Sequence, residues 1–136
     1  MNVSELMTKN PEYVTADETV RAALGKMLEL DVRHLPVLRD GELIGMLSDR
    51  DVSLYSTPID DEAYSLEDVH AKLDTPVSEI MNGAVLSIDE ESDASELIRL
   101  MIDNRVGAIP VVAASTGDLI GIVSYIDVLR AAESVL

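Results

Sequence analysis

Two short segments share one pattern: Gly45–Asp51 reads GMLSDRD, and Gly121–Asp127 reads GIVSYID. Each has a glycine, two apolar residues, a serine, two variable residues and an aspartate. The apolar residues before the serine predict a strand, and a serine followed three residues later by an acid is typical of a helix start. Both segments therefore predict a strand-to-helix junction, and the chain carries this junction twice.

The rest of the chain repeats around these junctions. An apolar stripe with the spacing of an amphipathic helix occurs in both halves, 74 positions apart (94 − 20). It comprises Val20, Ala23, Leu24, Met27 and Leu28, and then Ala94, Leu97, Ile98, Met101 and Ile102. One repeat buries too little apolar surface alone, so we expect the two to pack together.

The sequence pattern of each repeat predicts the element order β-α-β-β-α and therefore an α/β (α+β) fold. The first strands are expected near 13–14 and 87–88, and the amphipathic helices begin after Thr19 and Ser92 as N-caps. The later strands are HLPVL and ELIGMLS in the first repeat, and AIPVVA and DLIGIVS in the second. We expect two three-stranded sheets that face each other with pseudo-two-fold symmetry.

The predicted boundaries place the repeats at 1–56 and 77–136, joined by an acidic linker at 57–76. Within the linker, the stretch SLEDVHAKL predicts a helix that is capped by Ser65. Its apolar side would comprise Leu66, Val69 and Leu73.

Charge and composition restrict the class of partner. The chain has 26 Asp and Glu against 10 Lys and Arg, a net charge of −16, and no cysteine. Such a surface repels nucleic acid and anionic lipid, and disulfides are impossible. No apolar run is long enough to span a bilayer and no signal peptide is visible, so we expect a cytoplasmic protein with no nucleic-acid or membrane partner.

The stretches VRHLPVLRDGELIGMLSDRDV and VGAIPVVAASTGDLIGIVSYIDV resemble cystathionine-β-synthase (CBS) domains, in the tandem arrangement often called a Bateman module. The linker pattern AYSLEDVHAKLDTPVSEIM is similar to that of small stand-alone CBS-pair proteins of the acetoin-utilisation-protein type. The resemblance implies a regulatory module that binds an adenine nucleotide (AMP, ADP or ATP, with or without Mg²⁺) in clefts between the repeats. It also implies a homodimer and a regulated partner protein.

The serine and aspartate of each junction suit a nucleotide. Backbone N–H groups at a helix start attract phosphate, and an ionised aspartate can accept hydrogen bonds from two ribose hydroxyls. The resemblance assigns these roles to Ser48 and Asp51, and to Ser124 and Asp127. The alternative is a helix cap whose serine and aspartate touch no ligand.

The residues before the central strand form a second pair of candidates. The resemblance places Arg33 and His34 at the first cleft, and Gly107 and Ala108 at the second. An arginine there could bind phosphate with two hydrogen bonds, and the alternative is a solvated charge. The histidine could equally be a partly buried imidazole without a ligand.

Further candidates distinguish the two clefts. Arg50 adds a cation at the first junction, where its counterpart Ile126 adds none, so we expect the first cleft to bind a phosphorylated ligand more tightly. Ser87 matches a Ser or Thr that the family often carries near the pocket, whereas Tyr13 stands there in the first repeat and could stack on a base or obstruct it. Thr8 and Asn82 complete the candidates.

Two other functions compete with a nucleotide sensor. The first is a ligand-free dimerisation or docking module that regulates a partner protein. The second is a metal-dependent phosphoryl-transfer enzyme that uses carboxylates of SDRDVSLYSTPIDDE, namely Asp49, Asp51, Asp60, Asp61 and Glu62. The chain has no nucleophile motif, no P-loop and only two histidines, so we expect neither catalysis nor a metal site.

Overall fold

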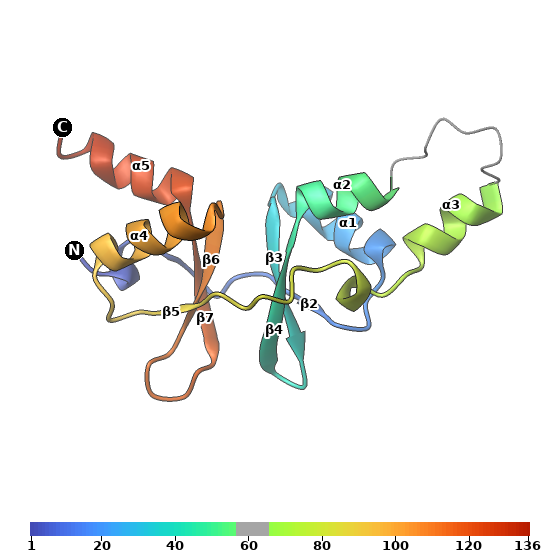
Figure 1. Cartoon of the computed structure of the whole chain (residues 1–136), viewed down its shortest axis with the longest axis horizontal. Coiled ribbons are helices and arrows are strands. Elements are labelled where there is room, and N and C mark those ends of the chain that lie inside the picture. The colour runs from blue at the N-terminus through green and yellow to red at the C-terminus, as the bar shows by residue number, and fades with distance from the viewer. Residues whose placement is uncertain (57–65) are drawn as a thin grey trace. The chain divides into compact units, whose positions relative to one another are not determined.

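The computed structural model describes residues 1–56 and 66–136, and it divides into two compact units (Figure 1). The first-repeat unit is Glu12–Val85. The second-repeat unit combines Met1–Pro11 with Leu86–Leu136. Both mix helices with a small sheet, as the α/β prediction requires.

The first-repeat unit has a three-stranded sheet in the order β2-β3-β4. Strand β2 runs parallel to β3, and β3 forms an antiparallel hairpin with β4. Its elements are β2 (Val14–Thr15), α1 (Val20–Leu30), β3 (His34–Arg39), β4 (Glu42–Ser48), α2 (Asp49–Ser56), α3 (Leu66–Leu73) and the 3₁₀ turn η2 (Val77–Glu79). The linker helix is thus confirmed over Leu66–Leu73, while its predicted cap Ser65 lies outside the described residues.

The second-repeat unit has a similar element order and one additional strand. Its sheet has the order β1-β7-β6-β5, with β5 parallel to β6 and the other pairs antiparallel. Its elements are η1 (Val3–Glu5), β1 (Thr8–Lys9), β5 (Ile88–Asp89), α4 (Ala94–Asn104), β6 (Ala108–Val112), β7 (Leu119–Ser124) and α5 (Tyr125–Glu133). This sheet therefore has four strands instead of the expected three.

The long helices begin at side-chain caps. Thr19 caps α1 as predicted, because its Oγ1 accepts a hydrogen bond from the Ala22 N–H at 3.1 Å. Asp93, and not Ser92, caps α4 by accepting from the Ser95 N–H at 3.0 Å. The prediction of Ser92 was one residue early, because Ser92 still belongs to the turn after β5, where its N–H donates to the Asp89 carbonyl at 3.2 Å, and Asp93 is the counterpart of Thr19 (93 − 19 = 74).

Each unit has its own core, built from the buried faces of its sheet and its long helix. The first core contains Val14, Ala16, Val20, Ala23, Met27, Leu35, Val37, Leu47, Val52 and Val77. The second contains Val3, Ile88, Leu97, Met101, Ile109, Val111 and Val123. Only part of each predicted stripe is buried, since Leu28 is 75% exposed and Ile102 is 61% exposed.

The turn segments that precede the first strands are exchanged between the repeats. Met7 packs on Gly121 of β7, so closely that a Cβ added to this glycine would lie 2.6 Å from the Met7 Sδ. Met81 packs on Gly45 of β4 in the same way, and the corresponding distance is 2.5 Å. The glycine of each junction motif therefore leaves room for a methionine that precedes the other repeat in the sequence.

Candidate ligand-binding site

The junction of the first-repeat unit brings together the end of β4, the start of α2 and the start of β3. His34 is the register partner of Ser48, and the Asp49 N–H donates to the Arg33 carbonyl at 2.8 Å. The turn is closed by a reciprocal pair: the Ser48 N–H donates to Asp51 Oδ2 at 3.0 Å, and the Asp51 N–H donates to Ser48 Oγ at 3.1 Å. The predicted residues thus meet at one point of the fold.

The second junction has the same backbone geometry. Ala108 is paired with Ser124, and the Tyr125 N–H donates to the Gly107 carbonyl at 2.9 Å. The Ser124 N–H donates to Asp127 Oδ2 at 2.8 Å, and the Asp127 N–H donates to Ser124 Oγ at 3.3 Å. Serine and aspartate therefore form a capping box in both units, which confirms the capping role.

Capping uses only some of the hydrogen-bonding atoms of these serine and aspartate side chains. Among the described residues, no hydrogen bond reaches Oδ1 of Asp51 or Asp127. The Ser124 hydroxyl donates to Asp127 Oδ2 at 3.1 Å, whereas the Ser48 hydroxyl donates to no described group. A carboxylate oxygen is thus available for a ligand at both junctions, and a hydroxyl donor at the first.

The two junctions differ in charge. Arg33 and Arg50 are exposed at the first junction, and within residues 1–56 and 66–136 neither forms an ion pair. The second junction has Gly107 and Ile126 at these positions. Unpaired guanidinium groups near a helix start can bind a phosphate with two hydrogen bonds each.

His34 is half-buried at the first junction, and burial lowers the pKa of its imidazole from the ordinary value of 6.5. Asp49 and Asp51 act in the opposite direction and raise this pKa, while Arg33 lowers it. The imidazole is therefore mainly neutral at neutral pH. A bound phosphate would add negative charge beside it and raise its pKa.

The other predicted residues are distributed over both units. Tyr13 belongs to the first-repeat unit, and its carbonyl accepts from Lys26 Nζ at 2.7 Å. Ser87 precedes β5 and is exposed. Thr8 lies in β1 of the second-repeat unit, whereas Asn82 bridges to β4 of the first-repeat unit.

The structure also bears on the competing functions. The described part of the chain contains no group of three or more His, Cys, Asp or Glu that could hold a metal ion. Asp60, Asp61 and Glu62 of the phosphoryl-transfer hypothesis lie outside the described residues. None of the helices seen in 1–56 and 66–136 combines the length and the apolar character that crossing a bilayer requires.

Known proteins share this arrangement. The CBS protein YhcV of Bacillus subtilis is 29% identical over 126 residues, which cover 93% of this chain and 81% of YhcV. The structure of an acetoin utilization protein (AcuB) from Vibrio cholerae has a TM-score of 0.79 at 26% identity, covering 99% of this chain and 92% of AcuB. The structure of CBSX2 in complex with AMP has a TM-score of 0.81 at 28% identity, covering 98% of this chain and 97% of CBSX2. The CBS domain model matches residues 3–57 and 77–134, and the chain therefore belongs to the CBS domain family, with two CBS domains in tandem.

Proposed function

We propose that the chain is a regulatory module that senses an adenine nucleotide bound at its Ser-x-x-Asp junctions. The main support is the first junction, where an unused aspartate oxygen, an available serine hydroxyl and two unpaired arginines meet at one helix start. The aspartate suits the ribose, and the hydroxyl, backbone and arginines suit phosphate. CBSX2, 28% identical, has been solved in complex with AMP.

The first junction is proposed as the tighter site. Its Arg33 and Arg50 are local cations in a chain of net charge −16, so they attract phosphate to this point of an otherwise repulsive surface. At the second junction, Gly107 and Ile126 replace the two arginines, so among the described residues we assign ligand contacts there to backbone groups, Ser124 and Asp127. Each added phosphate should therefore increase the preference for the first junction.

The proposed role is regulation without catalysis. We assign Asp51 to capping through Oδ2 and to the ribose through Oδ1, and this assignment gives it no part in proton transfer. Binding would instead change the stability of the helix start that the ligand contacts. We further propose that the nucleotide signal passes to a regulated protein in the cytoplasm.

A second candidate function is a ligand-free dimerisation or docking module. It is favoured by apolar side chains that the units leave exposed on their helices: Leu28 in α1 is 75% exposed, Ile102 in α4 is 61% exposed and Leu129 in α5 is 58% exposed. Exposed apolar side chains mark a protein contact where they form a continuous patch. A homodimer through these helices is compatible with nucleotide binding, so one protein can have both functions.

Titration calorimetry with AMP, ADP, ATP and adenosine, each with and without Mg²⁺, tests the nucleotide proposal. We expect binding that strengthens from adenosine to the phosphorylated ligands and weakens in the double variant Arg33→Gln, Arg50→Gln. Arg130→Gln, which removes an exposed arginine of α5, is the matched control. Absence of heat with all four ligands would leave only the docking function, and sedimentation would then test it through the expected dimer.

A further inference from the structure

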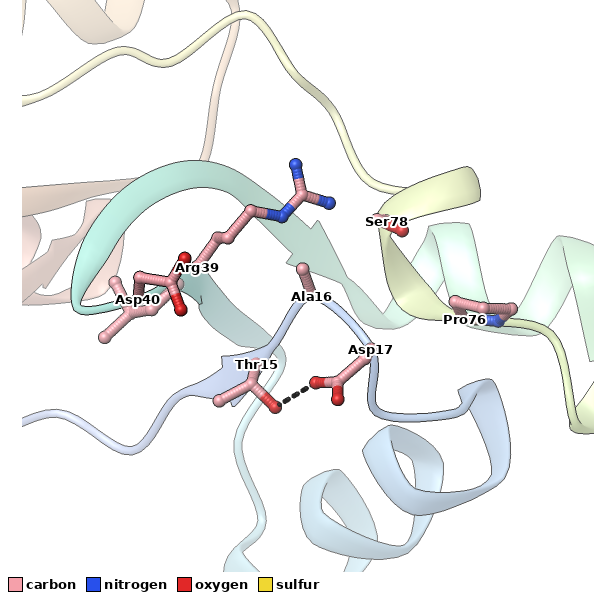
Figure 2. A pocket seen from close by; sticks show the side chains of 8 residues that line it. Thr15, Ala16, Asp17, Arg39, Asp40, Pro76 and Ser78 are labelled. Atoms are coloured by element: carbon pink, nitrogen blue, oxygen red, sulfur yellow. Dashed lines mark hydrogen bonds between the residues drawn. The ribbon is translucent and has the colours of Figure 1, made fainter.

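A hollow of about 670 Å³ lies within the first-repeat unit, and Figure 2 shows the side chains that line it. It is lined by Thr15, Ala16, Asp17, Leu38, Arg39, Asp40, Pro76 and Ser78. The β3–β4 hairpin separates it from the candidate nucleotide site, because His34 pairs with Ser48 at one end and Arg39 pairs with Glu42 at the other. This volume is within the range of small-molecule sites.

In the second-repeat unit, a glutamate side chain occupies the place that corresponds to this hollow. Ala16 corresponds to Glu90 at the offset of 74 (90 − 16), and the backbone confirms it: the Ser78 N–H donates to the Ala16 carbonyl at 3.2 Å, and the Ser4 N–H donates to the Glu90 carbonyl at 3.1 Å. Glu90 extends its carboxylate to the residues that follow β6, where its Oε2 accepts from the Ala114 N–H at 2.9 Å.

The first-repeat unit keeps the backbone contact at Ala16 but lacks this carboxylate, and its β3–β4 turn is tighter, with a positive φ of 51° at Asp40 and 80° at Gly41. Asp40 corresponds to Ala114 (114 − 40 = 74), and its N–H has no hydrogen-bond partner among the described residues. With alanine at position 16, the space that a glutamate side chain would occupy is part of the hollow. A carboxylate from another molecule could take the position that Glu90 fills in the other repeat.

The charges around the hollow have both signs. Arg39 is the one cationic side chain of the lining, and within the described parts of the chain it forms no ion pair. Asp17 and Asp40 supply two carboxylates, and that of Asp17 accepts from Thr15 Oγ1 at 2.9 Å (Figure 2). Two carboxylates disfavour a plain anion, whereas a plain amine would leave Arg39 without a partner.

We propose that this hollow binds a small molecule that carries both a carboxylate and an ammonium group, such as a free amino acid. The carboxylate accepts from the Asp40 N–H and the Arg39 guanidinium, in the position that corresponds to Glu90. The ammonium group donates to Asp17 and Asp40. The CBS pair would then respond to two chemically different ligands, because this site shares no residue with the junction.

Thermal unfolding of the full chain with each of the twenty common amino acids tests the proposal. At least one should raise the midpoint by about 4 °C at saturating concentration. The same compound without its amino group, and the same compound without its carboxylate, should each give less than half of that rise. No rise with any amino acid, or an equal rise with the deaminated analogue, would overturn the proposal.

Two variants locate the effect. Ala16→Glu should place a carboxylate in the hollow, as in the other repeat, and abolish the rise, while Ala22→Glu adds the same charge on the exposed side of α1 as a control. Arg39→Gln should weaken binding by about tenfold or more, and Arg130→Gln should not. If both Arg39→Gln and any folded Ala16→Glu protein respond like the wild type, the ligand binds elsewhere and the proposal is wrong. AMP should not compete.

Discussion

The two junctions have the same backbone and different surroundings. In both, a serine and an aspartate close a capping box, and the carbonyl before the central strand accepts the first helical N–H. The first junction adds two arginines and a histidine, where the second has Gly107, Ala108 and Ile126. The residues that close the capping box are thus duplicated, whereas the residues that suit a phosphate occur only at the first junction. Substitutions can therefore alter the fold and the proposed phosphate site separately.

The largest expected effect comes from removal of residues 1–11. This segment supplies fully buried Val3 and strand β1 to the second-repeat unit, together with Met7 against Gly121. Its loss should destabilise that unit by on the order of 5 kcal/mol and leave the first-repeat unit folded. Hydrogen exchange read separately over β3–β4 and β6–β7 would measure this.

The control for this deletion is removal of exposed Val135 and Leu136, which should change neither unit. Equal loss of protection in both units after removal of residues 1–11 would show that they unfold together. Unchanged protection in β6–β7 would show that the exchanged segment is dispensable.

The junction glycines should differ in their tolerance of a side chain. A Cβ at Gly45 would lie 2.9 Å from the Asn82 carbonyl oxygen, whereas at Gly121 the nearest backbone atom, the Thr8 carbonyl oxygen, is 3.1 Å away. Backbone yields less than a methionine side chain, so Gly45→Ala should cost about 3 kcal/mol and Gly121→Ala about 2 kcal/mol. Urea denaturation measures both, with Gly83→Ala as the control because no atom lies within 4 Å of its Cβ. A larger loss of stability for Gly121→Ala than for Gly45→Ala would mean that the second-repeat unit is packed more tightly around its junction glycine.

The aspartates should separate capping from binding. Loss of a charged hydrogen bond costs about 1.5–3 kcal/mol, so Asp51→Ala should weaken the tighter nucleotide site by about tenfold or more. Asp127→Ala should leave that site nearly intact. Asp51→Asn keeps an oxygen for the Ser48 N–H but removes the charge, so it should retain stability and still bind more weakly. If calorimetry shows that Asp127→Ala abolishes the tight phase, the assignment is reversed.

Most of the architecture could be predicted from the repeat, because strand alternation, helix stripes and caps are local signals. Apart from β1, the strands, both long helices and the linker helix occur close to where the pattern predicted them. The packing of Met7 on Gly121 and of Met81 on Gly45 was not predicted. Which side chain fills the space beside a strand glycine depends on tertiary packing, and the local sequence around the glycine does not specify it.

The site was predicted less completely than the fold. The motif identified Ser48 and Asp51, but only the geometry shows that one oxygen of the aspartate is already used in capping. The hollow beside Arg39 was missed, because it depends on alanine standing where the other repeat has glutamate. The 74-residue offset could have revealed that difference, yet its meaning depends on the Ala114 N–H that Glu90 contacts.

The smallest expected effect concerns pH, and it too distinguishes the repeats, since Ala108 stands where the first has His34. Burial lowers the pKa of His34 in the folded protein below its ordinary value of 6.5, so as the pH falls through this value the unfolded chain takes up the proton first. The free energy of unfolding should therefore fall below about pH 6.5 and level off once the folded state is also protonated. Urea denaturation of the wild type and of His34→Gln, at a series of pH values around and below 6.5, measures the contribution of His34 to the free energy of unfolding.

The charges around His34 sharpen this last prediction. Arg33 lowers the pKa of the imidazole, so Arg33→Gln should make the fall in stability smaller and end it at a higher pH. Asp49→Asn should make the fall larger and extend it to a lower pH, because Asp49 raises that pKa. A nucleotide phosphate at this junction would also raise it, so AMP should bind more tightly on acidification in the wild type and lose that dependence in His34→Gln. AMP affinity with the same pH dependence in both proteins would place the phosphate away from His34.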